Sequence, residues 1–174
     1  MSKVDCKVYI ATKMTGCDKA ELVARAERVC EIFREYGITP ISPVIEEKVA
    51  NESVKLINAD KERLAKFWKR DKEIIVKESH VLFWDHAEQK SFGVEREYAL
   101  NRFCLWKPTV IYVTPGTPTS VAEWEDDAVF TSVHAAGAFI AETYGTREKR
   151  QEWRWNMLKR SFGKWLFNQY LAWR

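Results

Sequence analysis

The chain has 174 residues, of which 46% are hydrophobic and 30% charged, and its formal net charge is +3. This length suffices for one domain with a substantial core and gives no reason to expect a second. There is no apolar run of about 18 residues, as a membrane span needs, and no signal-peptide pattern at the N-terminus. The sequence therefore predicts a cytoplasmic protein.

Five short apolar runs rich in β-forming residues alternate with segments of helical period. The predicted strands are Lys7–Thr12, Ile38–Ile41, His80–Trp84, Thr109–Val113 and Ala128–Val133. Between the first two, Asp18 is the expected N-cap of a helix that runs to about Tyr36, with Gly37 just beyond its end. This alternation predicts βαβ units and a mostly parallel sheet with helices on both faces.

In such a sheet, ligands bind beyond the carboxyl ends of the strands. The segments to search for chemistry are therefore 12–16, 42–53, 85–97 and 114–120. None of them contains a GxGxxG or GxxxxGK[ST] motif, so neither a dinucleotide fold nor a P-loop is supported. A phosphate here would be held by hydroxyls, backbone amides, Lys13 and a helix N-terminus.

One carboxylate lies on the apolar stripe of the helix predicted between Asn58 and Ser79. Asp71 follows Phe67 by four residues and precedes Ile75 by four. Burial raises the pKa of a carboxyl group, which suits a general acid. A salt bridge with a neighbouring Lys or Arg is the structural alternative, and the pattern alone leaves both open.

Two glutamates, Glu95 and Glu97, follow Gly93 at the start of the next predicted helix. Helical spacing places Glu97 with Val94, Tyr98, Asn101 and Cys104, and Glu95 with Ala99 and Arg102 on a wetter face. With a helix start near Gly93, Glu97 would lie in the first turn, where the macrodipole favours ionisation. A protonated Asp71 and an ionised Glu97 would be the carboxyl pair that cleaves a glycosidic bond, although first-turn glutamates are usually surface residues.

Three stretches resemble nucleoside 2-deoxyribosyltransferase-like proteins. They are "VYIATKMTG", which resembles the "YIAGPMTG" loop of a subgroup common in phages, "WKRDKEIIVKESHVLFW" and "SFGVEREYALNRF". The likeness covers about residues 5–113. It implies a flavodoxin-like (Rossmann-like) five-stranded α/β domain over residues 1–146, usually within a homodimer or larger homo-oligomer, that acts on a nucleoside or nucleotide.

The resemblance also implies roles for individual residues. Glu97 corresponds to the nucleophile that forms a covalent glycosyl-enzyme, Asp71 to the acid that protonates the departing base, and Tyr9 to a hydroxyl that orients the nucleophile. Ser91 stands where nucleotide hydrolases carry a phosphate-binding serine and transferases an aspartate. The further substrate and phosphate candidates are Gly93, Thr12, Lys13, Thr15, Gly16, Asp85 and Ser120, the last as a residue that would serve a neighbouring subunit's pocket.

The predicted activity is an N-glycosidase that hydrolyses a (2′-deoxy)nucleoside 5′-monophosphate. Base exchange by a nucleoside 2-deoxyribosyltransferase and a non-catalytic nucleotide- or nucleic-acid-binding module are the alternatives, and neither the base nor the sugar is specified. No cofactor is expected. The four cysteines have no CxxC pairing and the three histidines no metal-ligand spacing, so we predict reduced, mostly buried thiols, structural histidines and no metal site.

The C-terminal segment 147–174 is basic, with eight Lys or Arg against two Glu, and rich in Trp. Its apolar residues are spaced for one face of an amphipathic helix: Trp155, Leu158, Phe162, Trp165, Leu166 and Tyr170. We predict a helical extension of the domain that closes the core or a subunit interface. Nucleic-acid contact is a less favoured alternative, and membrane binding is not expected.

Overall fold

The computed structural model describes residues 4–14, 17–50, 61–89, 91–116 and 128–172. Within them, five parallel strands form one sheet in the order β2-β1-β3-β4-β5. The strands are β1 (Lys7–Thr12), β2 (Thr39–Ile41), β3 (Val81–Asp85), β4 (Thr109–Tyr112) and β5 (Ala128–Phe130). The five predicted strands and their parallel arrangement are confirmed. The bounds of β2, β3 and β4 differ from prediction by one residue, and the last strand ends at Phe130 because Ser132 caps the next helix.

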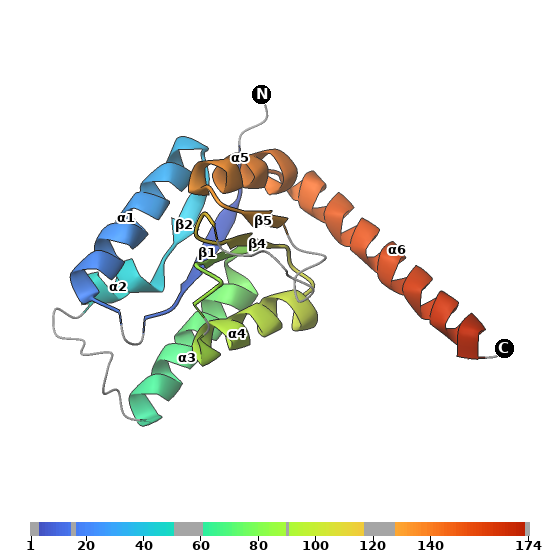
Figure 1. Cartoon of the computed structure of the whole chain (residues 1–174), viewed down its shortest axis with the longest axis horizontal. Coiled ribbons are helices and arrows are strands. Elements are labelled where there is room, and N and C mark those ends of the chain that lie inside the picture. The colour runs from blue at the N-terminus through green and yellow to red at the C-terminus, as the bar shows by residue number, and fades with distance from the viewer. Residues whose placement is uncertain (1–3, 15–16, 51–60, 90, 117–127, 173–174) are drawn as a thin grey trace.

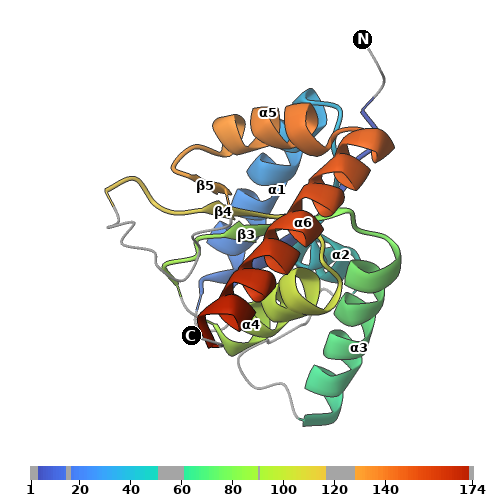
Figure 2. The ribbon, with the colours of Figure 1, turned by 90° about the vertical axis from the view of Figure 1, so that its right-hand side faces the viewer.

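Helices cover both faces of the sheet (Figures 1 and 2). Their bounds are α1 (Lys19–Glu35), α2 (Pro43–Ala50), α3 (Lys61–Lys77), α4 (Phe92–Ala99), α5 (Val133–Tyr144) and α6 (Arg147–Ala172). One core packs α1 and α5 on the sheet, and the other packs α3 and α4 on the opposite face. Because side chains alternate along β1, Val8 and Ile10 enter the first core whereas Tyr9 and Ala11 enter the second.

The ends of α1 follow from local sequence chemistry. The side chain of Asp18 accepts a hydrogen bond from the backbone N–H of Glu21, 2.9 Å away, as the predicted N-cap should. After the helix, Gly37 adopts a φ of 75°, in the left-handed region that costs glycine least. Both termini were predictable because they depend on residues within a few positions of each other.

The helix after β3 differs from its prediction. It begins at Phe92 and passes at Leu100 into a π-helical turn that ends at Cys104. The wider turn changes which residues face inward: Asn101 and Arg102 are both buried, and Cys104 is exposed. The predicted inward position of Cys104 and wet position of Arg102 are therefore wrong, because the 3.6-residue period does not continue through the turn.

The long helix α6 starts beside α5 and runs outward from the body (Figures 1 and 2). Its first turns are anchored by Trp153, whose ring packs edge-on against Tyr144, and by the buried Met157. Trp155 and Leu158, which we expected on a face that closes the core or a subunit interface, are exposed and so do not close the core. The described part of the chain contains no helix long and apolar enough to span a membrane.

Candidate active site

Three side chains from three different elements meet on the face of the sheet that α3 and α4 cover. Tyr9 lies on β1 and is fully buried, Glu97 lies on α4, and Asp71 lies on α3. The hydroxyl of Tyr9 donates a hydrogen bond of 3.0 Å to Oε1 of Glu97. Burial raises the pKa of both Glu97 and Tyr9, and the charge of Asp71 raises both further, so the three groups form one electrostatic unit.

Glu97 is not in the first turn of its helix, contrary to prediction. Since α4 begins at Phe92, Glu97 is its sixth residue, and the acidic side chain of the first turn is the exposed Glu95. Glu97 is 9% exposed, and burial together with the charge of Asp71 raises its pKa to about 8, against the weaker opposing effect of the Tyr9 hydrogen bond. The expectation that the macrodipole keeps Glu97 ionised is therefore wrong, because desolvation outweighs it.

Asp71 is buried, as its place on the apolar stripe predicted, and burial raises the pKa of its carboxyl group. The guanidinium of the preceding residue, Arg70, opposes that shift through hydrogen bonds of 3.0 and 3.2 Å to Oδ1. Both alternatives considered for Asp71 are thus present together: a desolvated carboxyl group and a salt bridge. Arg70 was missed, although it stands beside Asp71 in the sequence.

Contacts between α3 and α4 hold the two carboxyl groups on their common face. The guanidinium of Arg96, on α4, stacks 3.9 Å from the ring centroid of Trp68, on α3. A second contact joins α4 to the sheet: the ring of Tyr98 packs against Trp84 of β3, with ring centroids 5.2 Å apart. These aromatic contacts restrict how far α4 can move relative to α3 and β3.

The start of α4 presents a hydroxyl group that the helix does not use. Ser91 is the N-cap residue, but its side chain makes no capping hydrogen bond. Gly93 is exposed, and a Cβ atom built there would meet nothing closer than Oγ of Ser91, 3.9 Å away. The first turn of α4 is therefore open on the side of Ser91, which leaves its backbone amides and this hydroxyl accessible to an anion.

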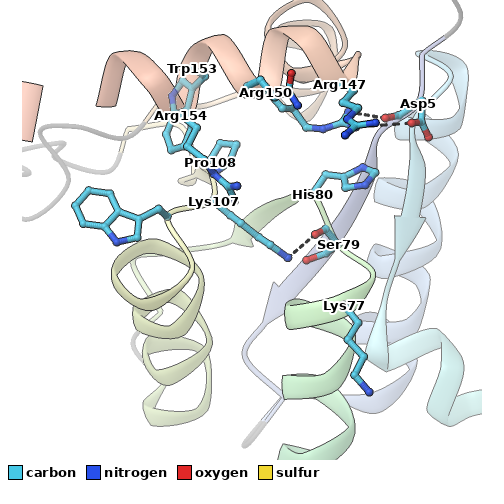
Figure 3. A pocket seen from close by; sticks show the side chains of 12 residues that line it. Asp5, Lys77, Ser79, His80, Lys107, Pro108, Arg147, Arg150, Trp153 and Arg154 are labelled. Carbon is cyan, nitrogen blue, oxygen red and sulfur yellow. Dashed lines mark hydrogen bonds and ion pairs between the residues drawn. The ribbon is translucent and has the colours of Figure 1, made fainter. Parts of the chain in front are cut away.

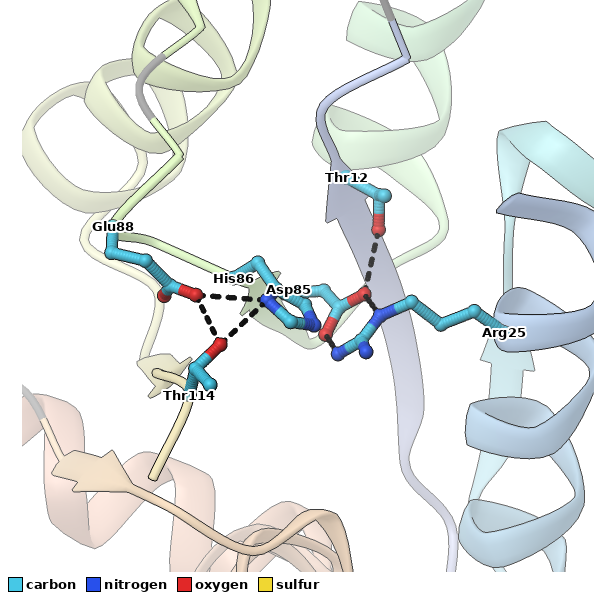
Figure 4. A network of polar contacts seen from close by, with 6 residues as sticks. All are labelled: Thr12, Arg25, Asp85, His86, Glu88 and Thr114. Carbon is cyan, nitrogen blue, oxygen red and sulfur yellow. Dashed lines mark hydrogen bonds and ion pairs between the residues drawn. The ribbon is translucent and has the colours of Figure 1, made fainter. Parts of the chain in front are cut away.

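A second polar group lies where the chain order reverses between β1 and β3, at the carboxyl ends of these strands (Figure 4). Asp85 is almost fully buried, and Arg25 of α1 binds both its oxygens, at 2.7 and 2.5 Å. Thr12 donates to the same carboxylate at 3.4 Å. Asp85 is therefore the last residue of a strand and not a loop residue, and its role as a sugar ligand stays a prediction.

Arg25 was missed, yet a signal existed. It lies three residues after Leu22 and four before Val29, on the buried stripe of α1. A cation on such a stripe requires a buried anion opposite it, and Asp85 is that anion.

The segment after β3 adds another cluster at this edge (Figure 4). His86 adopts a φ of 54° and its Nδ1 lies 2.8 Å from Glu88 and 3.0 Å from the hydroxyl of Thr114. Thr114 also donates to Glu88 at 2.5 Å. Nε2 of His86 and Oε2 of Glu88 are buried and have no hydrogen-bond partner among the residues that the structure describes.

The other predicted residues divide into two groups. Lys13 follows β1 and is half-buried, and its carbonyl accepts from the thiol of Cys17. Thr15, Gly16 and Ser120 lie outside the described residues. Among the residues described, no group of three or more His, Cys, Asp or Glu side chains is arranged to hold a metal ion.

A sheet in the order β2-β1-β3-β4-β5, with helices on both faces and polar groups beside the β1/β3 switch point, defines a flavodoxin-like α/β protein. No protein-family model matches the sequence, and no curated protein shows significant similarity to it. Solved structures do match. A 2-deoxyribosyltransferase from the psychrotolerant bacterium Bacillus psychrosaccharolyticus superposes with a TM-score of 0.55 at 21% identity, covering 75% of this chain and 90% of the other.

A conserved protein from Enterococcus faecalis V583 superposes with a TM-score of 0.52 at 17% identity, covering 79% of this chain and 98% of the other. At such identities the similarity concerns the fold. The chain thus has the α/β fold of nucleoside 2-deoxyribosyltransferase-like proteins, as the sequence resemblance predicted. The likeness to a subgroup common in phages stays a prediction.

Proposed function

We propose that this protein is an N-glycosidase that hydrolyses the bond between base and sugar in a (2′-deoxy)nucleoside 5′-monophosphate. The observation that carries the proposal is the buried unit of Tyr9, Glu97 and Asp71, in which one hydroxyl and two carboxyl groups interact on one face of the sheet. The fold shared with a 2-deoxyribosyltransferase supports the same chemistry.

In the first step, a carboxylate oxygen of Glu97 attacks C1′ while the bond from C1′ to the base nitrogen breaks. Asp71 transfers its proton to the departing base and becomes a carboxylate. In the second step, Asp71 accepts a proton from water, whose oxygen attacks C1′ and displaces Glu97. The products are the free base and a sugar 5-phosphate, and both carboxyl groups return to their starting states.

Tyr9 positions the nucleophile in this scheme. Burial and the charges of Glu97 and Asp71 raise the pKa of its phenol well above the ordinary value, so it remains a donor throughout the working pH range. Its hydrogen bond holds one oxygen of Glu97 and leaves the other to attack C1′.

Phosphate binding is assigned to the start of α4, with Lys13 as a further cation. The uncapped hydroxyl of Ser91 and the open first turn around Gly93 support this assignment. A hydroxyl and amide donors accept a dianion, whereas an aspartate at the same position would repel it.

Transfer of the sugar to a second base is the alternative, because it uses the same covalent intermediate and the solved relative is a 2-deoxyribosyltransferase. An assay that supplies one nucleotide and a different free base separates the two. We expect free base and deoxyribose 5-phosphate from at least one of the four deoxynucleoside monophosphates, without exchanged product. Exchange would assign the protein as a transferase, and no base release from either nucleotides or nucleosides would refute both activities.

The substitution Ser91→Asp tests the phosphate assignment. It places a carboxylate beside the bound phosphate, so we expect KM for the monophosphate to rise by about 10- to 100-fold, with kcat/KM for the unphosphorylated nucleoside no lower than before. Ser91→Ala is the matched control, which removes one hydrogen bond and should cost about 5- to 10-fold. Equal effects on nucleotide and nucleoside would show that Ser91 does not contact phosphate.

A further inference from the structure

A hollow of about 440 Å³ lies at the amino ends of β1, β3 and β4, at the opposite edge of the sheet from the switch point (Figure 3). Its walls come from the segment before β1, the end of α3, the loop before β4, and the first turns of α6. This volume is within the range of small-molecule sites. It is separate from the Glu97 site, whose residues do not line it.

The hollow is strongly cationic. Five of its lining residues carry a full positive charge and one a negative charge: Lys77, Lys107, Arg147, Arg150 and Arg154 against Asp5. Three of the cations are arginines on one face of α6, at spacings of three and four residues. A concave surface with this excess of positive charge attracts anions.

Two of the cations already have structural tasks. Lys107 reaches the end of α3, where its ammonium group donates to the carbonyls of Ile75, Val76 and Ser79. Arg150 anchors α6 through the carbonyl of Asp5 and that of Tyr144. These two residues form fixed parts of the wall, and their charges remain inside it.

The two other arginines, Arg147 and Arg154, are available to bind a ligand. Arg147 is exposed, and its guanidinium makes no hydrogen bond or ion pair with any residue that the structure describes. Arg154 makes one long hydrogen bond, 3.4 Å to the carbonyl of Leu105. Burial and the charge of Arg154 lower the pKa of Lys107 to about 8, which shows how strongly positive the hollow is. An anion would relieve that repulsion.

His80 adds a directed donor. Its Nδ1 accepts a hydrogen bond of 3.1 Å from the backbone N–H of Lys7, and burial lowers its pKa, so the neutral ring carries its proton on Nε2. Among the described residues no acceptor binds Nε2. Trp106 also lines the hollow and is 38% exposed, which leaves part of its indole face free to stack on a ring.

We propose that this hollow binds a phosphorylated ligand with an aromatic ring, of the mononucleotide class, at a site distinct from the Glu97 site. Arg147, Arg154 and Nε2 of His80 bind the phosphate, and the indole of Trp106 stacks on the base. A mononucleotide fits better than a nucleic-acid strand, because the cations converge from three elements on one hollow. Farther along α6, Lys159 lies over the ring of Trp155, so it does not extend the row of arginines along the helix.

The test measures 5′-AMP binding by isothermal titration calorimetry to the full chain carrying Glu97→Gln, which prevents turnover. Adenosine, inorganic phosphate and an eight-residue oligothymidylate are the comparison ligands. We expect the combined Arg147→Glu and Arg154→Glu changes to remove one equivalent of bound AMP, and Trp106→Ala to weaken that equivalent by about 5- to 100-fold. Adenosine should bind at least about 10-fold more weakly than AMP there.

The matched control reverses two charges farther along the same helix, with Lys159→Glu and Arg160→Glu, and should leave AMP binding unchanged. The pair Arg147→Gln and Arg154→Gln replaces the glutamate variant if circular dichroism shows that the latter is unfolded. Unchanged AMP stoichiometry in the pocket variants would overturn the proposal. A second result would also overturn it: oligothymidylate binds more than 100-fold tighter than AMP, and the Lys159 and Arg160 changes weaken that binding. This result would assign α6 to nucleic acid.

Discussion

Replacing Glu97 with Gln is expected to lower base release from a deoxynucleoside monophosphate by at least about 10³-fold, because the amide cannot form the glycosyl ester. The change is nearly isosteric, and the amide oxygen still accepts the Tyr9 hydrogen bond. Removing the charge from a buried group should not destabilise the fold. Base release is followed chromatographically, and folding by circular dichroism and thermal unfolding.

Glu95→Gln is the matched control, since Glu95 lies two residues earlier on α4 and is exposed. Its base release should equal that of the unmodified protein. Mass spectrometry adds a direct readout: a slow substrate, such as a 2′-fluoro analogue, should leave a sugar phosphate on the peptide that contains Glu97. Undiminished turnover in Glu97→Gln, or a label on another residue, would exclude Glu97 as the nucleophile.

The pH dependence of kcat/KM is expected to be bell-shaped, with its alkaline limb near pH 8. Catalysis needs one proton on the pair, with Glu97 ionised and Asp71 protonated. Burial raises the pKa of both groups, that of Glu97 to about 8, so above this pH the pair loses its last proton and no acid remains. The limbs belong to the coupled pair and not to single residues.

Asp71→Asn distinguishes this account from a simple requirement for ionised Glu97. Without Asp71 there is no acid to lose, so the remaining activity, lower by about 10²- to 10⁴-fold, should rise with pH to a plateau. Loss of the Asp71 charge lowers the pKa of Glu97 below about 8 while burial still raises it, so the plateau should be reached at or below about pH 8, where the unmodified protein loses activity. An alkaline fall that persists in Asp71→Asn would assign that limb to another group. Nucleoside substrates remove the phosphate ionisation near pH 6 from the comparison.

The proposed phosphate-site and catalytic roles rest on different features of α4. Ser91 and Gly93 lie at its open first turn, whereas Glu97 points from its second turn into the core that Tyr9 and Trp84 share. The homo-oligomer expected from the family resemblance stays a prediction, as does the contribution of Ser120. The exposed Trp155 and Leu158 of α6 are available for such a contact.

Much of the fold was predictable from the sequence, because its signals are local. Apolar runs placed the five strands, Asp18 and Gly37 bounded α1, and the stripe from Phe67 to Ile75 placed Asp71 inward. The π-helical turn after Ala99 was not predictable, since nothing in the sequence pattern indicates that the 3.6-residue period ends there, and tertiary packing decides that Arg102 is buried. For α6, tertiary packing likewise decides that Trp153 and Met157 face the body, whereas Trp155 and Leu158 do not close the core and their place in a subunit interface stays a prediction.

The same distinction between local signals and tertiary packing holds for the candidate site. Helical spacing singled out Asp71 and Glu97, and the family resemblance added Tyr9 and Ser91. The direction of the Glu97 pKa shift, the Arg70 and Arg25 ion pairs, and the cationic hollow beside α6 emerged from the folded chain. Periodicity reports which side of an element is buried. Charge interactions depend on distances between elements far apart in the chain, which the folded packing sets.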